Sequence, residues 1–207
     1  GEVYNQIEEW EQLCPLLPEL RRKKLFTEDI LTTMELNAYS GFLRSAHLSS
    51  HQELEKAWNK LPKTIQTQAE IILIYIELSS TNQQSSKQIE QIIIKSINHQ
   101  WESRLIDYYG RYKTEDSSAQ LATAEKWLQD YGNSDVLLLA LGRICIRLKL
   151  WGKAQSYLEA SIGVKSKPEN NLELANLLSR DELDLKEKAC TYFQQGLIAS
   201  LQQQTVS

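Results

Sequence analysis

Apolar residues recur at steps of three and four along most of the chain, which is the spacing that places them on one face of an α-helix. In segment 51–60 the positions Leu54, Ala57, Trp58 and Leu61 follow this pattern, with Ser50 as the cap before it and Leu61-Pro62 as its end. The same criteria predict two short helices in 5–20, helices at 27–46, 51–60, 64–78 and around 92–94, and helices at 101–112, 120–131, 134–148, 152–164, 169–179 and 185–203.

Two β-branched runs, 71–76 and 92–94, are also typical of a buried strand. The flanks of the first run carry its apolar pattern outward at helical steps, through Ile65, Ala69, Ile72 and Ile76. We therefore predict helix for both runs. The polar stretch 79–86 holds no apolar anchor and is predicted to be a flexible loop, and the polar stretch 114–119 is predicted to be a connection.

Residues 135–168 span 34 positions, the period of the tetratricopeptide repeat. In such a helix pair Gly142 is expected to face Ala154 at a close crossing, with Pro168 opening the next helix. The packing positions predicted for the repeats are Leu138, Leu141, Gly142, Trp151, Ala154 and Leu158, followed by Leu172, Ala175, Ala189, Phe193 and Gly196 in the next unit. Leu158 is expected to face the next pair, and Trp151 to pack across the turn.

The predicted fold is all-α, with tetratricopeptide-like helix-turn-helix repeats stacked into a right-handed superhelix, an α-solenoid, over a single domain of residues 1–207. The clearer repeats are 101–131, 135–168 and 169–203, whereas 1–98 holds divergent helix pairs, placed at 27–60 and 64–98. The alternative is a closed helical bundle. Eight glycines and four prolines are too few for the turns of an all-β domain of this length.

The net charge of -4 argues against a general nucleic-acid binder, which needs an excess of Lys and Arg. The three cysteines, Cys14, Cys145 and Cys190, are odd in number and widely spaced, and suggest neither a disulfide framework nor a zinc site. We expect Cys145 to be buried and inert. No run of about 18 apolar residues appears, as a transmembrane helix would require. The start at Gly-Glu-Val suggests a fragment.

Several strings resemble the C-terminal region of the HemY family of protoheme biogenesis proteins. The most specific is Leu-Trp-Gly-Lys-Ala-Gln-Ser-Tyr-Leu-Glu-Ala-Ser at 150–161, preceded by Leu-Leu-Leu-Ala-Leu-Gly-Arg at 137–143. Weaker matches are Ala-Glu-Lys-Trp-Leu at 124–128, Leu-Leu-Pro-Glu-Leu-Arg at 16–21, Trp-Asn-Lys-Leu-Pro at 58–62 and Asp-Tyr-Tyr-Gly at 107–110. The resemblance implies a bacterial inner-membrane protein associated with late haem synthesis, whose N-terminal membrane anchor is absent here and whose soluble domain lies on the cytoplasmic face. It supplies no catalytic residues.

Candidate haem ligands are Cys14, before Pro15, and His51, with His47 and His99 as weaker candidates. The simpler interpretation makes Pro15 a helix starter, His47 and His51 solvated loop residues that share no helical face, and His99 a helix-end cation. The basic residues predicted to line a partner-binding groove and bind carboxylates are Arg104, Arg111, Arg143, Arg147 and Lys153, with solvated helix faces as the alternative. The cluster 21–24 fits either anionic lipid headgroups or the end of a helix.

The sequence contains no Gly-rich phosphate loop, His-Glu metal motif or nucleophile elbow. We therefore expect a non-catalytic scaffold without a cofactor, which binds a haem-synthesis enzyme through a concave groove. The alternatives are a tetrapyrrole-binding carrier or regulator, a tetratricopeptide module unrelated to haem, and an enzyme of the haem pathway. The pattern leaves the oligomeric state open.

Overall fold

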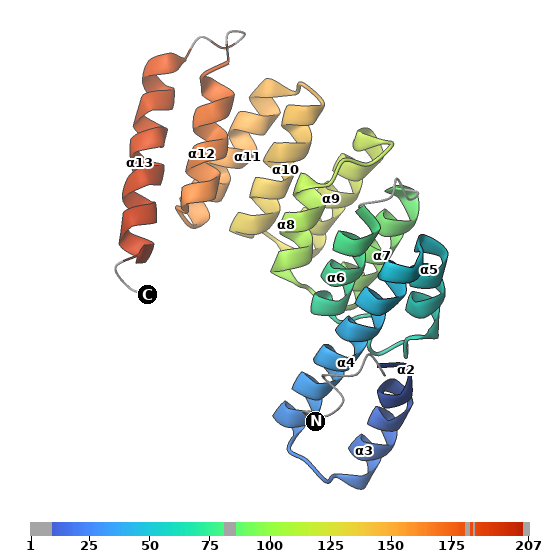
Figure 1. Ribbon diagram of the computed structural model, residues 1–207. Helices are drawn as coiled ribbons and strands as arrows, with labels where there is room; N and C mark the ends of the chain where they lie inside the picture. Colours follow the sequence, from blue (N-terminus) through green and yellow to red (C-terminus); the bar gives the residue numbers. More distant parts are fainter. Residues whose placement is uncertain (1–9, 81–85, 181–182, 184, 205–207) are drawn as a thin grey trace. The chain divides into compact units, whose positions relative to one another are not determined.

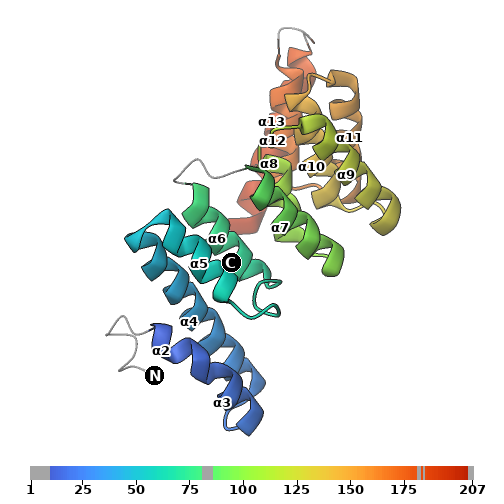
Figure 2. The same cartoon turned by 90° about the vertical axis from the view of Figure 1, so that its right-hand side faces the viewer.

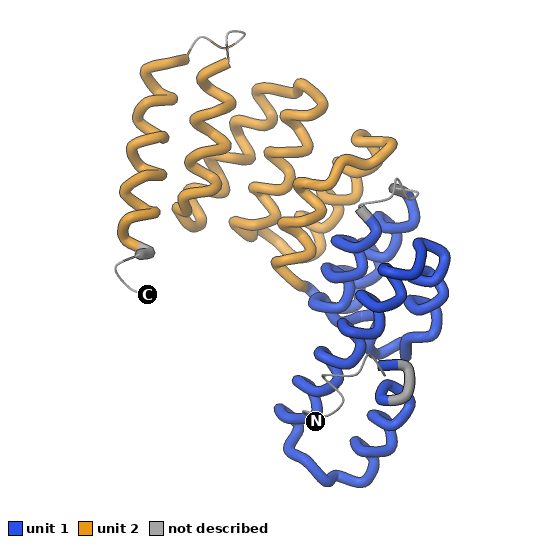
Figure 3. The backbone as a smooth tube through the Cα atoms, in the orientation of Figure 1, with its two compact units in different colours: residues 1–101 blue, residues 102–207 orange. Residues whose placement is uncertain are grey.

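The computed structural model describes residues 10–80, 86–180, 183 and 185–204. Over these residues it is all-helical and contains no strand, which confirms the predicted class. The chain divides into two compact units, residues 1–101 and 102–207 (Figure 3). This boundary lies next to the predicted change from divergent helix pairs to clearer repeats.

The first unit begins with short helices that pack on a long one. Its elements are α2 (Trp10–Leu13), the 3-10 helix η1 (Cys14–Leu16), α3 (Leu17–Lys23), α4 (Glu28–Ser49), α5 (His51–Lys60), α6 (Ala69–Ser80) and α7 (Ser86–His99) (Figure 1). Helix α4 contacts α2, η1 and α3, and also α5 and α6. The core of the unit therefore lies around α4, where Ala38 and Leu43 are fully buried.

Local signals in the sequence set most of these helix boundaries. Pro15 and Pro18 lie in the first turns of η1 and α3, where the missing N–H has no intrahelical acceptor to lose. The basic cluster ends α3, and Lys24 closes it with a left-handed φ of 51°. Ser50 caps α5 by accepting a hydrogen bond from Glu53 N at 3.2 Å.

Several predicted boundaries in this unit were wrong. Helix α4 continues to Ser49, beyond the predicted end near Ala46. Helix α6 begins at Ala69 and not at Thr64, because Ile65 N and Gln66 N donate to Pro62 O in a separate turn. Ser79, Ser80 and Ser86 belong to helices, whereas residues 81–85 of the predicted loop lie outside the described residues. Both β-branched runs are helical, as predicted, and Tyr75 of α6 stacks on Trp58 with ring centroids 4.2 Å apart.

The second unit consists of α8 (Ser103–Arg111), α9 (Ser117–Tyr131), α10 (Asp135–Arg147), α11 (Trp151–Val164), α12 (Pro168–Leu178) and α13 (Lys186–Gln204). Helix α10 packs against α11 and α12 against α13, as expected of helix pairs. Helix α10 also contacts α8, α9 and α12, and α11 contacts α12 (Figures 1 and 2). Each helix of the unit thus covers apolar surface on at least one neighbour.

Glycines permit two close crossings in this unit. A Cβ added at Gly110 would lie 2.5 Å from Ala140 Cα, so α8 and α10 meet backbone to backbone there. A Cβ added at Gly142 would lie 2.6 Å from Leu158 Cγ and Cδ2. The expected partner of Gly142 was Ala154; the nearest atoms instead belong to Leu158, one helical turn further along α11. Leu158 was expected to face the next pair, but it packs against Gly142 within its own pair.

Most of the predicted packing positions are buried. The buried ones are Leu138, Leu141, Gly142, Ala154, Leu158, Ala175, Ala189 and Gly196. Trp151 is half-buried, and the Arg180 guanidinium lies over its ring at 4.9 Å. Phe193, 38% exposed, and Leu172 are wrong as core positions, because they face outward from α13 and α12. Helix α13 therefore keeps apolar side chains at its surface.

Candidate functional site

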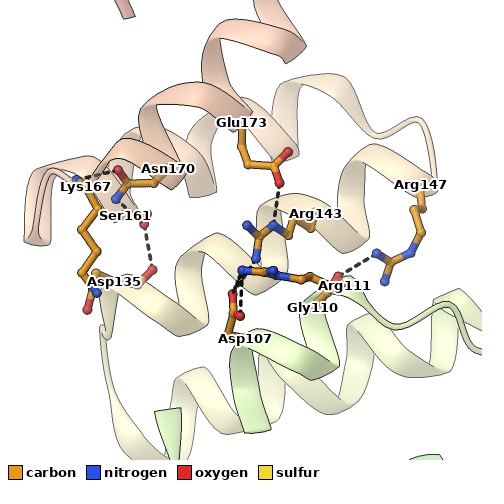
Figure 4. A network of polar contacts seen from close by, with 10 residues as sticks. All are labelled: Asp107, Gly110, Arg111, Asp135, Arg143, Arg147, Ser161, Lys167, Asn170 and Glu173. Atoms are coloured by element: carbon orange, nitrogen blue, oxygen red, sulfur yellow. Dashed lines mark hydrogen bonds and ion pairs between the residues drawn. The ribbon is translucent and has the colours of Figure 1, made fainter. Parts of the chain in front are cut away.

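A buried arginine connects three helices of the second unit. Arg143 on α10 has a side chain only 9% exposed. Its Nη1 donates to Asp107 Oδ1 on α8 at 2.7 Å, and its Nε donates to Glu173 Oε1 on α12 at 2.6 Å (Figure 4). Two carboxylates offset the cost of burying one guanidinium, and the three helices are held in register by charge-assisted hydrogen bonds.

A second arginine, Arg147, lies one turn further along α10 and donates hydrogen bonds at the C-terminal end of α8. Arg147 Nη1 donates to Gly110 O at 2.7 Å and its Nη2 donates to Gln120 Oε1 at 2.9 Å. Gln120, itself buried, donates to Tyr109 O at 2.7 Å and to Tyr112 O at 2.9 Å. These last carbonyls of α8 have no intrahelical donor, so Arg147 and Gln120 act as its C-terminal cap. Burial, followed by the charge of Arg143, lowers the pKa of Arg147.

Lys153 is engaged between α11 and α9. Its Nζ lies 2.5 Å from Glu125 Oε1, which also accepts a hydrogen bond from the Tyr157 hydroxyl at 2.9 Å. The hydrogen bond from Lys153 lowers the pKa of the Glu125 carboxyl, although partial burial opposes this effect. Burial and the hydrogen bond to Glu125 raise the pKa of Tyr157. The lysine therefore stabilises the contact between these two helices.

The two remaining basic candidates lie on the exposed face of α8. The side chains of Arg104 and Arg111 are 52% and 58% exposed. Arg104 Nε lies 3.1 Å from Glu102 Oε1, and Arg111 Nη2 lies 2.9 Å from Asp107 Oδ2. Asp107 is thus shared between Arg111 and the buried Arg143.

Two tyrosines lie close to these arginines in the sequence: Tyr108 between Arg104 and Arg111, and Tyr112 directly after Arg111. The rings of Tyr108 and Tyr112 stack with centroids 5.6 Å apart and an interplanar angle of 28°. Both are half-buried, and burial raises the pKa of Tyr108 to about 12. Its hydroxyl, protonated at neutral pH like that of an ordinary tyrosine, can donate a hydrogen bond. We call Arg104, Tyr108, Arg111 and Tyr112 the α8 surface.

A polar cluster at the start of α12 was missed by the sequence analysis. Ser161 Oγ donates to Asp135 O at 2.7 Å and accepts from Asn170 Nδ2 at 3.1 Å, while Lys167 Nζ lies 2.6 Å from Asp135 Oδ2 (Figure 4). Lys167 N donates to Asn170 Oδ1 at 2.8 Å, so the side chain at the third position of α12 satisfies the backbone N–H of the residue that precedes the helix. The spacing from Lys167 to Asn170 around Pro168 was the available signal.

The five basic residues therefore divide into two groups. Arg143, Arg147 and Lys153 serve contacts between helices. Arg143 is buried and bonded to two carboxylates, whereas Nε of the half-buried Arg147 is buried without a hydrogen-bond partner in the described part of the chain. Partner binding through these three residues stays a prediction. Arg104 and Arg111 are exposed, and partner binding through them stays a prediction.

The haem-ligand candidates belong to different elements of the first unit. Cys14, in η1, lines a pocket of about 460 Å³ whose described lining includes no histidine. His47 lies near the end of α4 and His51 begins α5, so these two share no helix, as predicted. Their interpretation as solvated loop residues was wrong, because α4 runs to Ser49 and both histidines are helical and half-buried. His51 Nε2 is 4.0 Å from Glu55. His99 is the last residue of α7. Haem ligation by Cys14 or His51 stays a prediction.

The described residues contain no group of three or more His, Cys, Asp and Glu side chains placed to hold a metal ion.

Cys145 is buried, as predicted, and burial raises its pKa to about 11, whereas Cys190 is exposed. Among the described helices, none is both long and apolar enough to cross a bilayer.

Comparison with known proteins gives one distant relationship. No family model matches the chain. The chain is 22% identical over 203 residues to Protein HemY of Escherichia coli strain K12, which covers 97% of this chain and 50% of that protein. Protein HemY of Shigella flexneri matches to the same extent. The chain thus spans about half the length of these curated relatives, and the similarity supports a HemY-like relationship over nearly all of it.

Proposed function

We propose that this chain is a non-catalytic scaffold of tetratricopeptide-like helix pairs, stacked as a right-handed superhelix, that binds a protein partner through the α8 surface. The observation that carries the proposal is the buried Arg143, which joins α8, α10 and α12. Because its two carboxylate partners come from different helices, the row of helices is held rigidly. A surface on a rigid support loses less side-chain and backbone entropy when a partner binds, and this favours binding.

The composition of the α8 surface supports a protein partner. Arg and Tyr are enriched among the residues that contribute most to interfaces. Here Arg104, Tyr108 and Arg111 lie on one short helix, and Tyr112 directly follows it as the C-cap. Because Asp107 is shared with Arg143, the charge of Arg111 is incompletely neutralised. The α8 surface is therefore suited to a partner segment that carries carboxylates.

The relationship to HemY supports haem synthesis as the setting, since that family is associated with its late steps. In this proposal the partner is an enzyme of haem synthesis, and the complete protein is held at the bacterial inner membrane with this domain on the cytoplasmic face. The basic residues at the end of α3 would then contribute attraction to anionic headgroups, of about 1 kcal/mol for each one near the surface. Arg22 and Lys24 in this cluster are exposed.

The experiment is a pull-down from bacterial membranes with the full-length protein and two α8 variants, Tyr108→Ala and Arg111→Ala, read out by mass spectrometry for enzymes of haem synthesis. Lys126→Ala on α9 is the control, because Lys126 is also exposed but lies outside the α8 surface. We expect both α8 variants to lose the enzyme and the control to retain it. Equal recovery by all variants would remove the α8 surface from the proposal. An assay on protoporphyrin precursors is expected to show no turnover by the purified chain.

A further inference from the structure

The connection between α3 and α4 exposes three large apolar side chains. Leu25, Phe26 and Ile30 lie within six consecutive positions and are 62%, 44% and 48% exposed. Every residue from 22 to 30 is exposed, and the connection lies at the end of the first unit away from α5, α6 and α7 (Figures 1 and 2). We call residues 22–30 the α3–α4 tip. Single exposed apolar residues are ordinary, but a group of them rimmed by polar residues marks an interaction surface.

The turn that carries these side chains is held in place by Arg21. Arg21 Nε and Nη2 donate to the buried Glu35 at 3.0 and 2.9 Å, and its Nη1 pairs with Glu28 in the first turn of α4. Lys24, with its left-handed φ of 51°, turns the chain out of α3. The end of α3 is therefore fixed to α4 on both sides of the turn, so little backbone entropy is lost when the tip binds a surface.

The charges of the α3–α4 tip give a small positive excess. Lys23 is already paired with Glu19 at 2.9 Å. Arg22 and Lys24 pair with no carboxylate in the described part of the chain, and the carboxylate of Asp29 likewise has no cation there. Two cations therefore stand against one carboxylate. This excess favours an anionic surface modestly, so the apolar side chains would contribute most of the binding.

The order of charged and apolar residues favours lipid over a protein partner. Lys24 directly precedes Leu25 and Phe26, at the point where the tip is most exposed. Lysine is depleted from protein–protein interfaces. At a bilayer surface, by contrast, the apolar stem of a lysine lies along the hydrocarbon boundary while its ammonium group stays among the headgroups, beside inserted apolar side chains.

We propose that the α3–α4 tip inserts into the surface of an anionic bilayer. Leu25, Phe26 and Ile30 enter the boundary between headgroups and acyl chains, and Arg22 and Lys24 bind headgroup phosphates. The inference rests on the membrane setting of the proposed function and deepens it, because it names the part of this domain that contacts lipid. It is independent of partner binding by the α8 surface, since the tip belongs to the first unit.

The first test is sedimentation of the chain with vesicles made of equal parts of phosphatidylcholine and phosphatidylglycerol. Leu25→Ser is expected to weaken binding about tenfold, because the transfer of a largely exposed leucine side chain out of water is lost. Leu48→Ser is the matched control: the same exchange is made at a leucine that is 83% exposed near the other end of α4. It should leave binding unchanged. Equal effects of the two substitutions, or no sedimentation of the unmodified chain, would overturn the proposal.

The contribution of charge is tested by comparing these vesicles with vesicles of phosphatidylcholine alone. Lys24→Gln should weaken binding to the anionic vesicles about fivefold and leave binding to the neutral ones unchanged. Lys126→Gln removes the same charge from an exposed position on α9 and should change neither. An equal loss in both variants would contradict binding of phosphates by the tip.

A further measurement needs no variant and uses trypsin cleavage after exposed lysines. Anionic vesicles should slow cleavage after Lys24 at least severalfold and leave cleavage after Lys165, exposed between α11 and α12, unaffected. Unchanged cleavage after Lys24 in the vesicle-bound chain would place the contact elsewhere and contradict the proposal.

A protein occupant of the tip would give a different result. In that case the chain binds neither kind of vesicle, and benzoylphenylalanine in place of Phe26 crosslinks to a protein in cells, which overturns insertion into lipid. The vesicle mixtures contain no enzyme of haem synthesis, so their failure is distinguishable from a failure of the α8 surface to recover that enzyme.

Discussion

Gly110→Ala should destabilise the second unit, because the added methyl group would meet the backbone of α10. The new Cβ would lie 2.5 Å from Ala140 Cα and 2.6 Å from Ala140 Cβ. Carbon atoms at their best separation are about 3.5 to 4.0 Å apart, so α8 and α10 would have to separate by about 1 Å. Separation of this size would also strain the hydrogen bond from Arg147 to Gly110 O.

The magnitude follows from two opposing effects. Overpacking of a core costs about 1 to 3 kcal/mol, and the upper end applies here because the obstacle is backbone. Replacing Gly by Ala inside a helix returns about 1 kcal/mol. We expect a net loss of about 2 kcal/mol in the free energy of unfolding of this unit.

Hydrogen exchange read on peptides of α8 and α10 is the appropriate assay, because it reports local opening of this unit separately from the other one. Gly163→Ala on α11 is the matched control, since a Cβ there meets nothing within 4 Å. It should leave stability unchanged or raise it by up to about 1 kcal/mol. Equal protection in the two variants would refute the close crossing of α8 and α10.

Three further results are expected. Arg143→Ala should lower the free energy of unfolding by about 2 to 4 kcal/mol in urea titrations, because it leaves two carboxylates without their shared cation, whereas the exposed Arg111→Ala should cost less than about 1 kcal/mol. The hydrogen bond from Lys153 lowers the pKa of Glu125 in the fold, so its stabilisation is present at neutral pH and is lost as the pH falls from about 4.3 through the folded pKa. Glu125→Gln should therefore show a smaller loss of stability between pH 5 and pH 3 in thermal melts, and an unchanged loss would contradict the assignment. Cys145, buried and with a pKa of about 11, should react with thiol reagents only at the rate of unfolding; rapid labelling of the folded chain would show the burial to be wrong.

Local chemistry in the sequence was sufficient to predict most of the helices. The spacing of apolar residues and the caps identified α5 at its observed bounds, because Ser50 and Leu61-Pro62 act within a few residues of it. The predicted start of α6 was too early. Ile65 is buried and lies at helical spacing from the apolar residues of α6, but it belongs to the separate turn that follows Pro62. Apolar periodicity alone does not separate a turn that packs on the core from the helix that follows it.

Contacts between residues that are far apart in the sequence could not be predicted from local patterns. Arg143 meets Asp107 and Glu173, which lie 36 and 30 positions away, and no local motif distinguishes these carboxylates from others on exposed faces. The close crossing at Gly110 was also not predicted, because the repeat pattern indicated Gly142, and not Gly110, as the site of close contact between helices. Phe193 fitted the apolar spacing of a packed helix, yet the spacing does not say whether another helix covers that face.

Site-specific photo-crosslinking in cells tests the central claim most directly. A benzoylphenylalanine introduced in place of Tyr108 in the full-length protein reports what lies against the α8 surface, and the same group in place of Lys126 reports on α9. The account predicts that position 108, and not position 126, crosslinks to an enzyme of haem synthesis. A crosslink to that enzyme from position 126 alone, or no crosslink to any such enzyme from position 108, would contradict it.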